Sequence, residues 1–80
     1  MKVFFPKKFK MVSASAPHPT NTEYKVSVGE EDWGGNYHTV IKVQMVYDGL
    51  LAGRRSPSYP IGSDDYKRVC NAIDELLKEI

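Results

Sequence analysis

The hydrophobic positions near the C-terminal end of the chain repeat with the period of an α-helix. Within residues 63–80, apolar side chains recur every three or four residues, as in one stripe of a helix. Ser63 precedes the pattern, and its hydroxyl can accept a hydrogen bond from a free amide of the first turn, so it is the expected N-cap. Asp64 and Asp65 follow, where the helix dipole favours negative charge. The apolar stripe that should pack on the rest of the chain consists of Tyr66, Val69, Cys70, Ile73, Leu76, Leu77 and Ile80.

The middle of the chain alternates apolar and polar residues, which is the pattern of half-buried strands. A short run covers residues 24–28, and a longer run covers residues 37–47 with apolar side chains on one face. Asp48 and Gly49 follow the longer run and form a dipeptide that is typical of hairpin turns. They predict that the chain returns as a third strand over residues 50–55, before two prolines end the pairing.

Two registers are open for this hairpin. A two-residue turn places Met45 opposite Ala52, whereas a three-residue turn with a bulge places Met45 opposite Leu51. The second puts Leu51 on the apolar face of the sheet, and it is therefore the preferred register. Because a slip of one residue moves each side chain to the other face, the register also decides whether Arg54 or Arg55 faces water.

The order of these elements predicts an α+β domain over residues 23–80. Its small antiparallel sheet has three strands, in the order β-β-β-α, and the C-terminal helix packs on one face. Residues 1–22 precede it as a basic and aromatic segment and a tether rich in serine, alanine and proline. The lysines and phenylalanines of this segment suit a fourth strand at the sheet edge, or an arm for single-stranded nucleic acid or an anionic membrane surface.

Composition limits the function classes further. Eighty residues with 41% hydrophobic content form one domain near the lower size limit for a self-sufficient core. The net charge of +1 provides no strong field that would steer the whole molecule to nucleic acid or a membrane. The single cysteine, Cys70, excludes an intrachain disulfide and favours a reducing compartment, so a cytoplasmic location is expected. No apolar run has the length of a membrane span.

The charge is distributed unevenly along the chain. Residues 1–62 hold eight Lys/Arg against five Asp/Glu, a net +3, whereas residues 63–80 hold three against five, a net −2. Part of the positive charge should fall on the sheet face away from the helix. That face is either a solvated sheet surface or a nucleic-acid interface, because lysine and arginine can contact phosphates and glutamine can read a base edge. The candidate contacts are Lys25, Lys42, Gln44, Arg54 and Arg55.

Two aromatic residues are expected in loops. Trp33 stands in an acidic loop beside two glycines, and tryptophan is over-represented at binding hot spots. Tyr59 stands in a loop that combines arginine, serine and proline. Both are candidate contacts for a protein partner. The alternatives are a Trp33 ring folded back over an open edge of the core and a loop at Tyr59 that serves as a rigid connection.

The sequence contains no signature of catalysis or metal binding. Cys70 lies on the apolar helix stripe, where a thiol acts as a small hydrophobic side chain. His18 and His38 have no ligand spacing with it. We therefore expect no catalytic residue, no cofactor and no metal. The expected function is a non-catalytic module that binds a protein partner or a second copy of itself, with nucleic-acid binding as the alternative.

Overall fold

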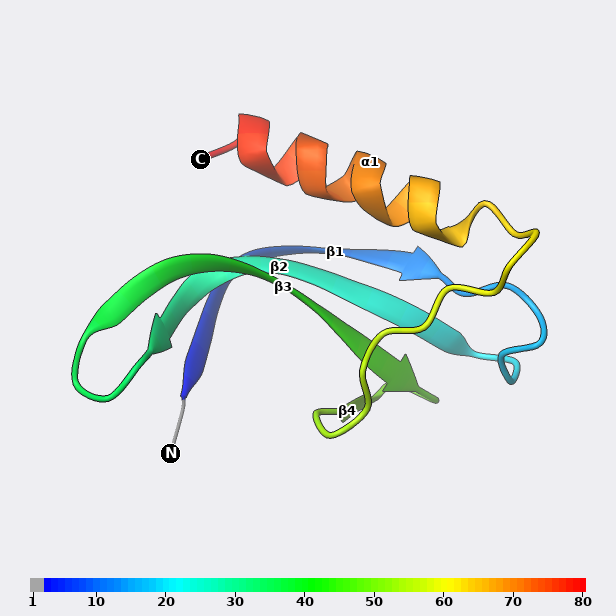
Figure 1. The fold of residues 1–80 in the computed structure, drawn as a ribbon, viewed down its shortest axis with the longest axis horizontal. Helices are drawn as coiled ribbons and strands as arrows, with labels where there is room; N and C mark the ends of the chain where they lie inside the picture. The colour runs from blue at the N-terminus through cyan, green and yellow to red at the C-terminus, as the bar shows by residue number, and fades with distance from the viewer. Residues whose placement is uncertain (1–2) are drawn as a thin grey trace.

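A computed structural model describes residues 3–80 and shows a four-stranded antiparallel sheet followed by one helix (Figure 1). The α+β class, the antiparallel sheet and the C-terminal helix predicted from the sequence are confirmed. The fourth strand is the N-terminal one. The elements are β1 (Phe4–Ser13), β2 (Thr22–Asp32), β3 (Tyr37–Tyr47), β4 (Leu50–Ala52) and α1 (Asp65–Lys78), and the strands lie in the order β1-β2-β3-β4.

Strand β1 belongs to the segment that precedes the predicted domain, and it is paired along β2. The pairing runs from Phe4 opposite Glu31 to Ser13 opposite Glu23, with a bulge near Pro6. The bulge inserts one residue and so bends the strand. The end of the sheet that carries the β2–β3 hairpin curves away from the helix (Figure 1).

The predicted register of the β3–β4 hairpin is wrong. Met45 pairs with Ala52, so the turn has two residues instead of three. Asp48 and Gly49 have φ angles of 50° and 79°, the left-handed values that a two-residue type I′ turn requires and that this dipeptide adopts at low cost. Leu51 therefore lies opposite Val46, on the face away from the helix.

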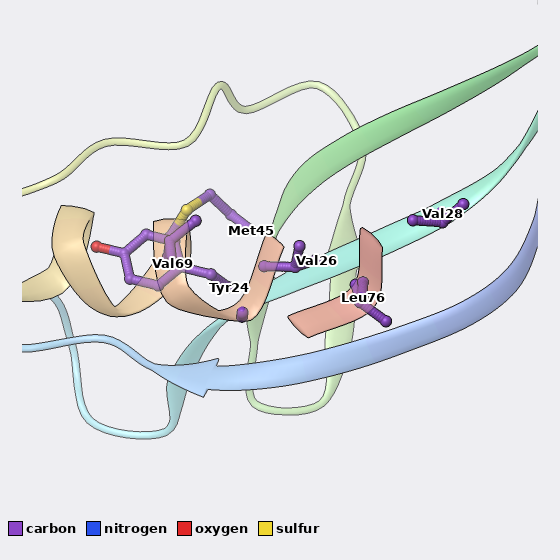
Figure 2. Close-up of a cluster of buried hydrophobic side chains, with 7 residues drawn as sticks. Tyr24, Val26, Val28, Met45, Val69 and Leu76 are labelled. Atoms are coloured by element: carbon purple, nitrogen blue, oxygen red, sulfur yellow. The ribbon is translucent and has the colours of Figure 1, made fainter. Parts of the chain in front are cut away.

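The core lies between β2 and α1. Alternate side chains of β2 point to the helix and meet three buried helix residues, while one buried side chain of the cluster comes from β3 (Figure 2). Each of these large apolar side chains stabilises the fold by about 1.5–3 kcal/mol through burial. The core side chains labelled in Figure 2 are Tyr24, Val26, Val28, Met45, Val69 and Leu76.

The helix buries a different face from the one that the apolar stripe predicts. Its buried residues are Asp65, Val69, Ala72 and Leu76, so the contact line shares Val69 and Leu76 with the predicted stripe but is rotated from it by somewhat less than one residue, or about 80°. Several members of the predicted stripe are consequently exposed, with exposed fractions of 64% for Tyr66, 48% for Leu77 and 68% for Ile80.

The helix also begins later than predicted. Its N-cap is Asp64, which makes no side-chain capping hydrogen bond. The predicted cap, Ser63, donates its hydroxyl hydrogen to the Pro60 carbonyl at 2.6 Å and accepts a long 3.4 Å bond from the Asp65 amide. The hydroxyl therefore closes the preceding turn instead of capping the helix.

A substitution at Gly29 should test the close approach of β1 and β2. A Cβ atom there would collide with the backbone of Phe5 and Pro6. Gly29→Ala should therefore lower the free energy of unfolding by about 1–3 kcal/mol in urea denaturation. Gly53→Ala is the matched control, because a Cβ there meets no atom within 4 Å. Equal stability of the two variants would contradict the close approach.

Candidate functional site

The helix leaves part of the sheet uncovered. It packs mainly over β1 and β2. On β3, the side chains of Val43 and Ile41 lie opposite Val26 and Val28, on the helix side of the sheet, but both are only half-buried. Two apolar residues of β3 are therefore accessible beside the core.

The outer edge of β3 is also largely unpaired. Strand β4 pairs only with residues 45–47 of β3, so among residues 3–80 no strand covers the outer edge of residues 37–44. An exposed edge of this kind presents backbone N–H and C=O groups that can pair with another strand.

The hydrogen-bond pattern shows which backbone groups point outward. The Ala14 amide donates to the Thr22 carbonyl, and the Asp32 amide donates to the Val3 carbonyl, each at 2.9 Å, so the even-numbered residues of β2 face β1. The backbone groups of the odd-numbered residues of β2 therefore point toward β3, where they exchange hydrogen bonds with the even-numbered residues. The outward groups of β3 belong to its odd-numbered residues. Within the open part they are those of Tyr37, Thr39, Ile41 and Val43.

The helix flank that faces away from β1 is apolar. On the opposite flank, Lys8 and Lys10 lie 3.6 Å and 3.4 Å from the Glu79 carboxylate, which places that flank over β1. The flank toward β3 carries Ile73, which packs against the core, and Leu77 one turn further on. We call the open part of β3 together with this flank the edge surface. Its main residues are Thr39, Ile41, Val43, Ile73, Leu77 and Ile80.

The predicted basic residues lie on the other face of the sheet. Lys25 is directly opposite Gln44, and Lys42 is the next residue of β3 on that face. Both lysines already have partners. Lys42 forms an ion pair with the buried carboxylate of Glu31, and the Lys25 ammonium lies 4.6 Å from the centre of the Phe9 ring, in cation–π geometry.

Both predicted arginines follow β4 and are exposed. Arg54 and Arg55 line a hollow of about 250 Å³ together with Lys42 and Gln44, so four of the five candidate residues meet around one concavity. The Arg55 guanidinium also lies 5.6 Å from the centre of the Tyr47 ring. The structure thus gathers these residues, although two of the charges are already engaged.

Trp33 lies at the tip of the β2–β3 hairpin and is 49% exposed. Its indole N–H donates to the Glu31 carboxylate at 2.7 Å, and its ring lies 4.4 Å from the His38 ring, between centroids. The ring is therefore folded back against β3 while half of its surface remains accessible.

Tyr59 packs on Tyr24 near the start of β2, whereas Trp33 follows the end of the same strand. The Tyr59 side chain is half-buried between Tyr24 and Tyr66, with ring centroids 5.1 Å and 5.3 Å away. The two predicted protein contacts are thus not brought together. The Tyr59 ring borders a hollow of about 430 Å³ that is otherwise lined largely by proline, tyrosine and His18.

A buried carboxylate at the start of α1 is the polar feature that sequence analysis missed. Asp65, which the sequence indicated only as an acid of the first helical turn, is fully buried. Its carboxylate accepts hydrogen bonds from the Ser15 amide and hydroxyl at 2.9 Å and 2.5 Å, from the Tyr24 hydroxyl at 2.7 Å and from the Arg68 guanidinium at 2.7 Å. Four donors from three segments of the chain therefore meet at one side chain.

This environment shifts two pKa values in opposite directions. Burial alone would raise the pKa of Asp65, but the hydrogen bonds from Ser15, Tyr24 and Arg68 outweigh it, so the pKa lies well below its usual range. Burial and the neighbouring Asp65 carboxylate raise the pKa of the Tyr24 hydroxyl well above its usual range. The tyrosine consequently remains a proton donor and the aspartate remains charged.

The remaining chemistry of the described residues is sparse. Cys70 is a free, half-buried thiol on the helix, and His38 stacks on Trp33 at the hairpin. Within residues 3–80, no group of three or more His, Cys, Asp or Glu side chains could hold a metal ion. The one helix in this range lacks the length and apolar character needed to cross a membrane. Comparison with known proteins finds no matching family model and no significantly similar curated protein or solved structure.

Asp65→Asn should show how much the buried carboxylate contributes. The variant should lose about 2–4 kcal/mol of unfolding free energy at pH 7, because donors are left without their charged acceptor. A lowered folded-state pKa stabilises the protein above the unfolded pKa of about 4, and this stabilisation is lost as the pH falls below it. The wild type should therefore lose stability between about pH 5 and pH 2 more steeply than the variant.

The measurement is urea denaturation of both proteins at pH 7, 5, 3 and 2. Asp64→Asn is the matched control, because Asp64 is exposed and only its pair with Arg68 is lost. The control should change stability by less than about 1 kcal/mol. Parallel pH profiles for wild type and Asp65→Asn would contradict the assigned role of the carboxylate.

Proposed function

We propose that the protein is a non-catalytic protein-binding module that takes an extended segment of another polypeptide chain as a fifth strand beside β3. The observation that carries the proposal is the open edge of β3, where the outward backbone groups of Tyr37, Thr39, Ile41 and Val43 have no strand partner within residues 3–80. Strand addition uses main-chain hydrogen bonds for affinity and alternate side chains for specificity.

The edge lacks the features that usually prevent strand addition. Such features are proline, a bulge or several charges on the exposed strand. Residues 37–44 contain no proline, and Lys42 is their one Lys, Arg, Asp or Glu. The side chain of Lys42 points to the far face, where it pairs with Glu31. An incoming strand therefore meets no charge on the side that carries the helix.

The geometry also defines the chemistry of the partner. Alternate side chains of the incoming strand would lie beside Ile41 and Val43, on the face of the sheet that carries the helix. An apolar residue at every second position of the partner would bury this surface. Trp33 lies beside the beginning of the same edge, because its ring stacks on His38. The free Cys70 suits a reducing compartment, and we place this function in the cytoplasm.

Thr39→Pro tests this proposal, because it removes one outward N–H group. The Thr39 side chain is exposed, so its replacement removes little packing. Random 12-residue peptides displayed on phage would be selected on the wild-type protein, and the enriched peptides synthesised for affinity measurements. We expect alternating apolar residues in them and about tenfold weaker binding to Thr39→Pro, equivalent to about 1.4 kcal/mol.

Thr39→Ala is the matched control, because it keeps the amide and should bind the peptides nearly as well as the wild type. Peptides that bind all three proteins equally, or failure to select any peptide, would contradict strand addition at this edge.

A second candidate function is the binding of single-stranded nucleic acid on the other face of the sheet. It is favoured by the opposition of Lys25 to Gln44 and by Phe9, which lies on the same face and is 55% exposed. Exposed aromatic rings among basic residues can stack on bases while the charges contact phosphates. The pairing of Lys42 with Glu31 reduces the charge available, which makes this the weaker candidate.

The double variant Lys25→Ala/Arg54→Ala tests the second candidate. With about three phosphate contacts, binding of a fluorescent 20-nucleotide single strand should weaken with salt with a log–log slope of about −2. The variant should bind at least tenfold more weakly in fluorescence anisotropy. Lys67→Ala/Lys78→Ala on the helix removes the same charge and should bind as the wild type does. Equal loss in the two variants would contradict a specific face.

A further inference from the structure

We propose that the hollow beside Tyr59 binds a small aromatic carboxylate, with Arg55 as the partner of its charge. This hollow, which we call the Tyr59 hollow, has a volume of about 430 Å³. It lies between the β1–β2 connection, the end of β3 and the β4–α1 connection, and its lining consists of three prolines and two tyrosines together with His18, Arg55 and Ser58. None of these residues belongs to the open part of β3, so the site is separate from the proposed strand addition.

The walls of the Tyr59 hollow are fixed by contacts between distant segments. The Ser58 carbonyl accepts hydrogen bonds from the Tyr24 hydroxyl at 2.9 Å and from Nε2 of His18 at 2.8 Å. These bonds tie the β4–α1 connection to β2 and to the β1–β2 connection (Figure 1). The Tyr59 ring is held between the rings of Tyr24 and Tyr66. Because the walls are already in place, a ligand need not order them, and less of its binding energy is lost.

The shape and lining of the Tyr59 hollow favour a flat ring. The faces of the Tyr47 and Tyr59 rings are apolar surfaces on which another aromatic ring packs in an offset or edge-on arrangement. The proline rings supply further apolar surface. The volume lies toward the lower end of the range of about 300–1,000 Å³ that is usual for small-molecule sites. A ligand with one ring or two fused rings suits this space.

The charge at the border of the Tyr59 hollow determines the second group of the ligand. Arg55 is exposed, and its guanidinium lies 5.6 Å from the centre of the Tyr47 ring. Among residues 3–80, no Asp or Glu side chain forms an ion pair with Arg55, and none lines the hollow. A carboxylate matches the planar fork of a guanidinium and can accept two hydrogen bonds from it. A carboxylate attached to the bound ring therefore complements Arg55.

Two other hollows of the described residues lack this combination. The one near the β3–β4 turn is lined by Glu23 and Asp48, which would repel a carboxylate, and it contains no aromatic side chain. The one formed by Arg54, Arg55 and Lys42 has positive charge but no aromatic side chain either. Arg55 borders this hollow as well, whereas Arg54 does not line the Tyr59 hollow. The two neighbouring arginines thus provide a matched pair for an experiment.

Titration of the ¹⁵N-labelled full-length protein with benzoate, followed by amide NMR, tests the site. Benzoate should shift the amide signals of His18, Tyr47, Arg55, Ser58 and Tyr59, with a dissociation constant of about 1–5 mM. Benzamide keeps the ring without the charge, and acetate keeps the charge without the ring. Each should bind about tenfold more weakly than benzoate, because each loses one of the two contacts. Sodium chloride is adjusted so that the ionic strength stays constant.

Arg55→Gln and its control Arg54→Gln test the charge partner. Both side chains are exposed, so neither substitution removes core packing. Arg55→Gln should weaken benzoate binding about tenfold and leave benzamide binding unchanged, because only the interaction with the carboxylate is lost. Arg54→Gln removes the same charge one residue away and should bind benzoate as the wild type does.

Three outcomes would overturn the inference. The first is the absence of shifts at the lining residues at about 50 mM benzoate, a concentration well above the expected dissociation constant. The second is equal binding of benzoate and benzamide, or equal weakening by Arg55→Gln and Arg54→Gln, which would remove Arg55 as the charge partner. The third is tighter binding of N-acetylphenylalanine than of benzoate, which would assign the site to the end of a polypeptide chain instead of a small molecule.

Discussion

The buried carboxylate of Asp65 determines how the helix lies on the sheet. Its hydrogen-bond donors come from the β1–β2 connection through Ser15, from β2 through Tyr24 and from the next helical turn through Arg68. A charge that has lost its water must keep such donors, because an unsatisfied buried carboxylate is strongly unfavourable. The first turn of the helix is therefore fixed at the place where these three segments meet. This contact also sets the rotation of the helix about its own axis.

This rotation connects stability with the surface that we propose for binding. With Asp65 turned inward, Val69 and Leu76 follow on the same line and form the core with β2. At the other end, Glu79 holds the helix over β1 through two lysines. The helix cannot then also cover β3. The apolar flank of the helix and the accessible residues of β3 are thus consequences of the same packing that stabilises the monomer.

On the opposite face of the sheet, an ion pair decides whether a charged residue is available to a ligand. Lys25, Lys42 and Gln44 share that face, as the alternation of their strands predicts. The ion pair between Lys42 and the buried Glu31 converts one of the two lysines into a structural group. The proximity of the basic residues follows from the register alone, whereas their availability to a ligand depends on the acidic side chain beside them. For this reason the open edge of β3 supports a function better than the basic face does.

The sequence by itself determined β2, β3 and the helix, because a period of two in residues 24–28 and 37–47 and a period near 3.6 in residues 63–80 are local properties of the chain, but it left β1 open as a strand or an arm. It also located the hairpin turn at Asp48 and Gly49. The tertiary structure decided the two-residue turn register, which of two adjacent helix stripes is buried, and that β4 is too short to cover β3. These depend on contacts between distant segments, above all on Ser15 and Tyr24 meeting Asp65. No local pattern distinguishes such a buried aspartate from an ordinary acid of the first helical turn.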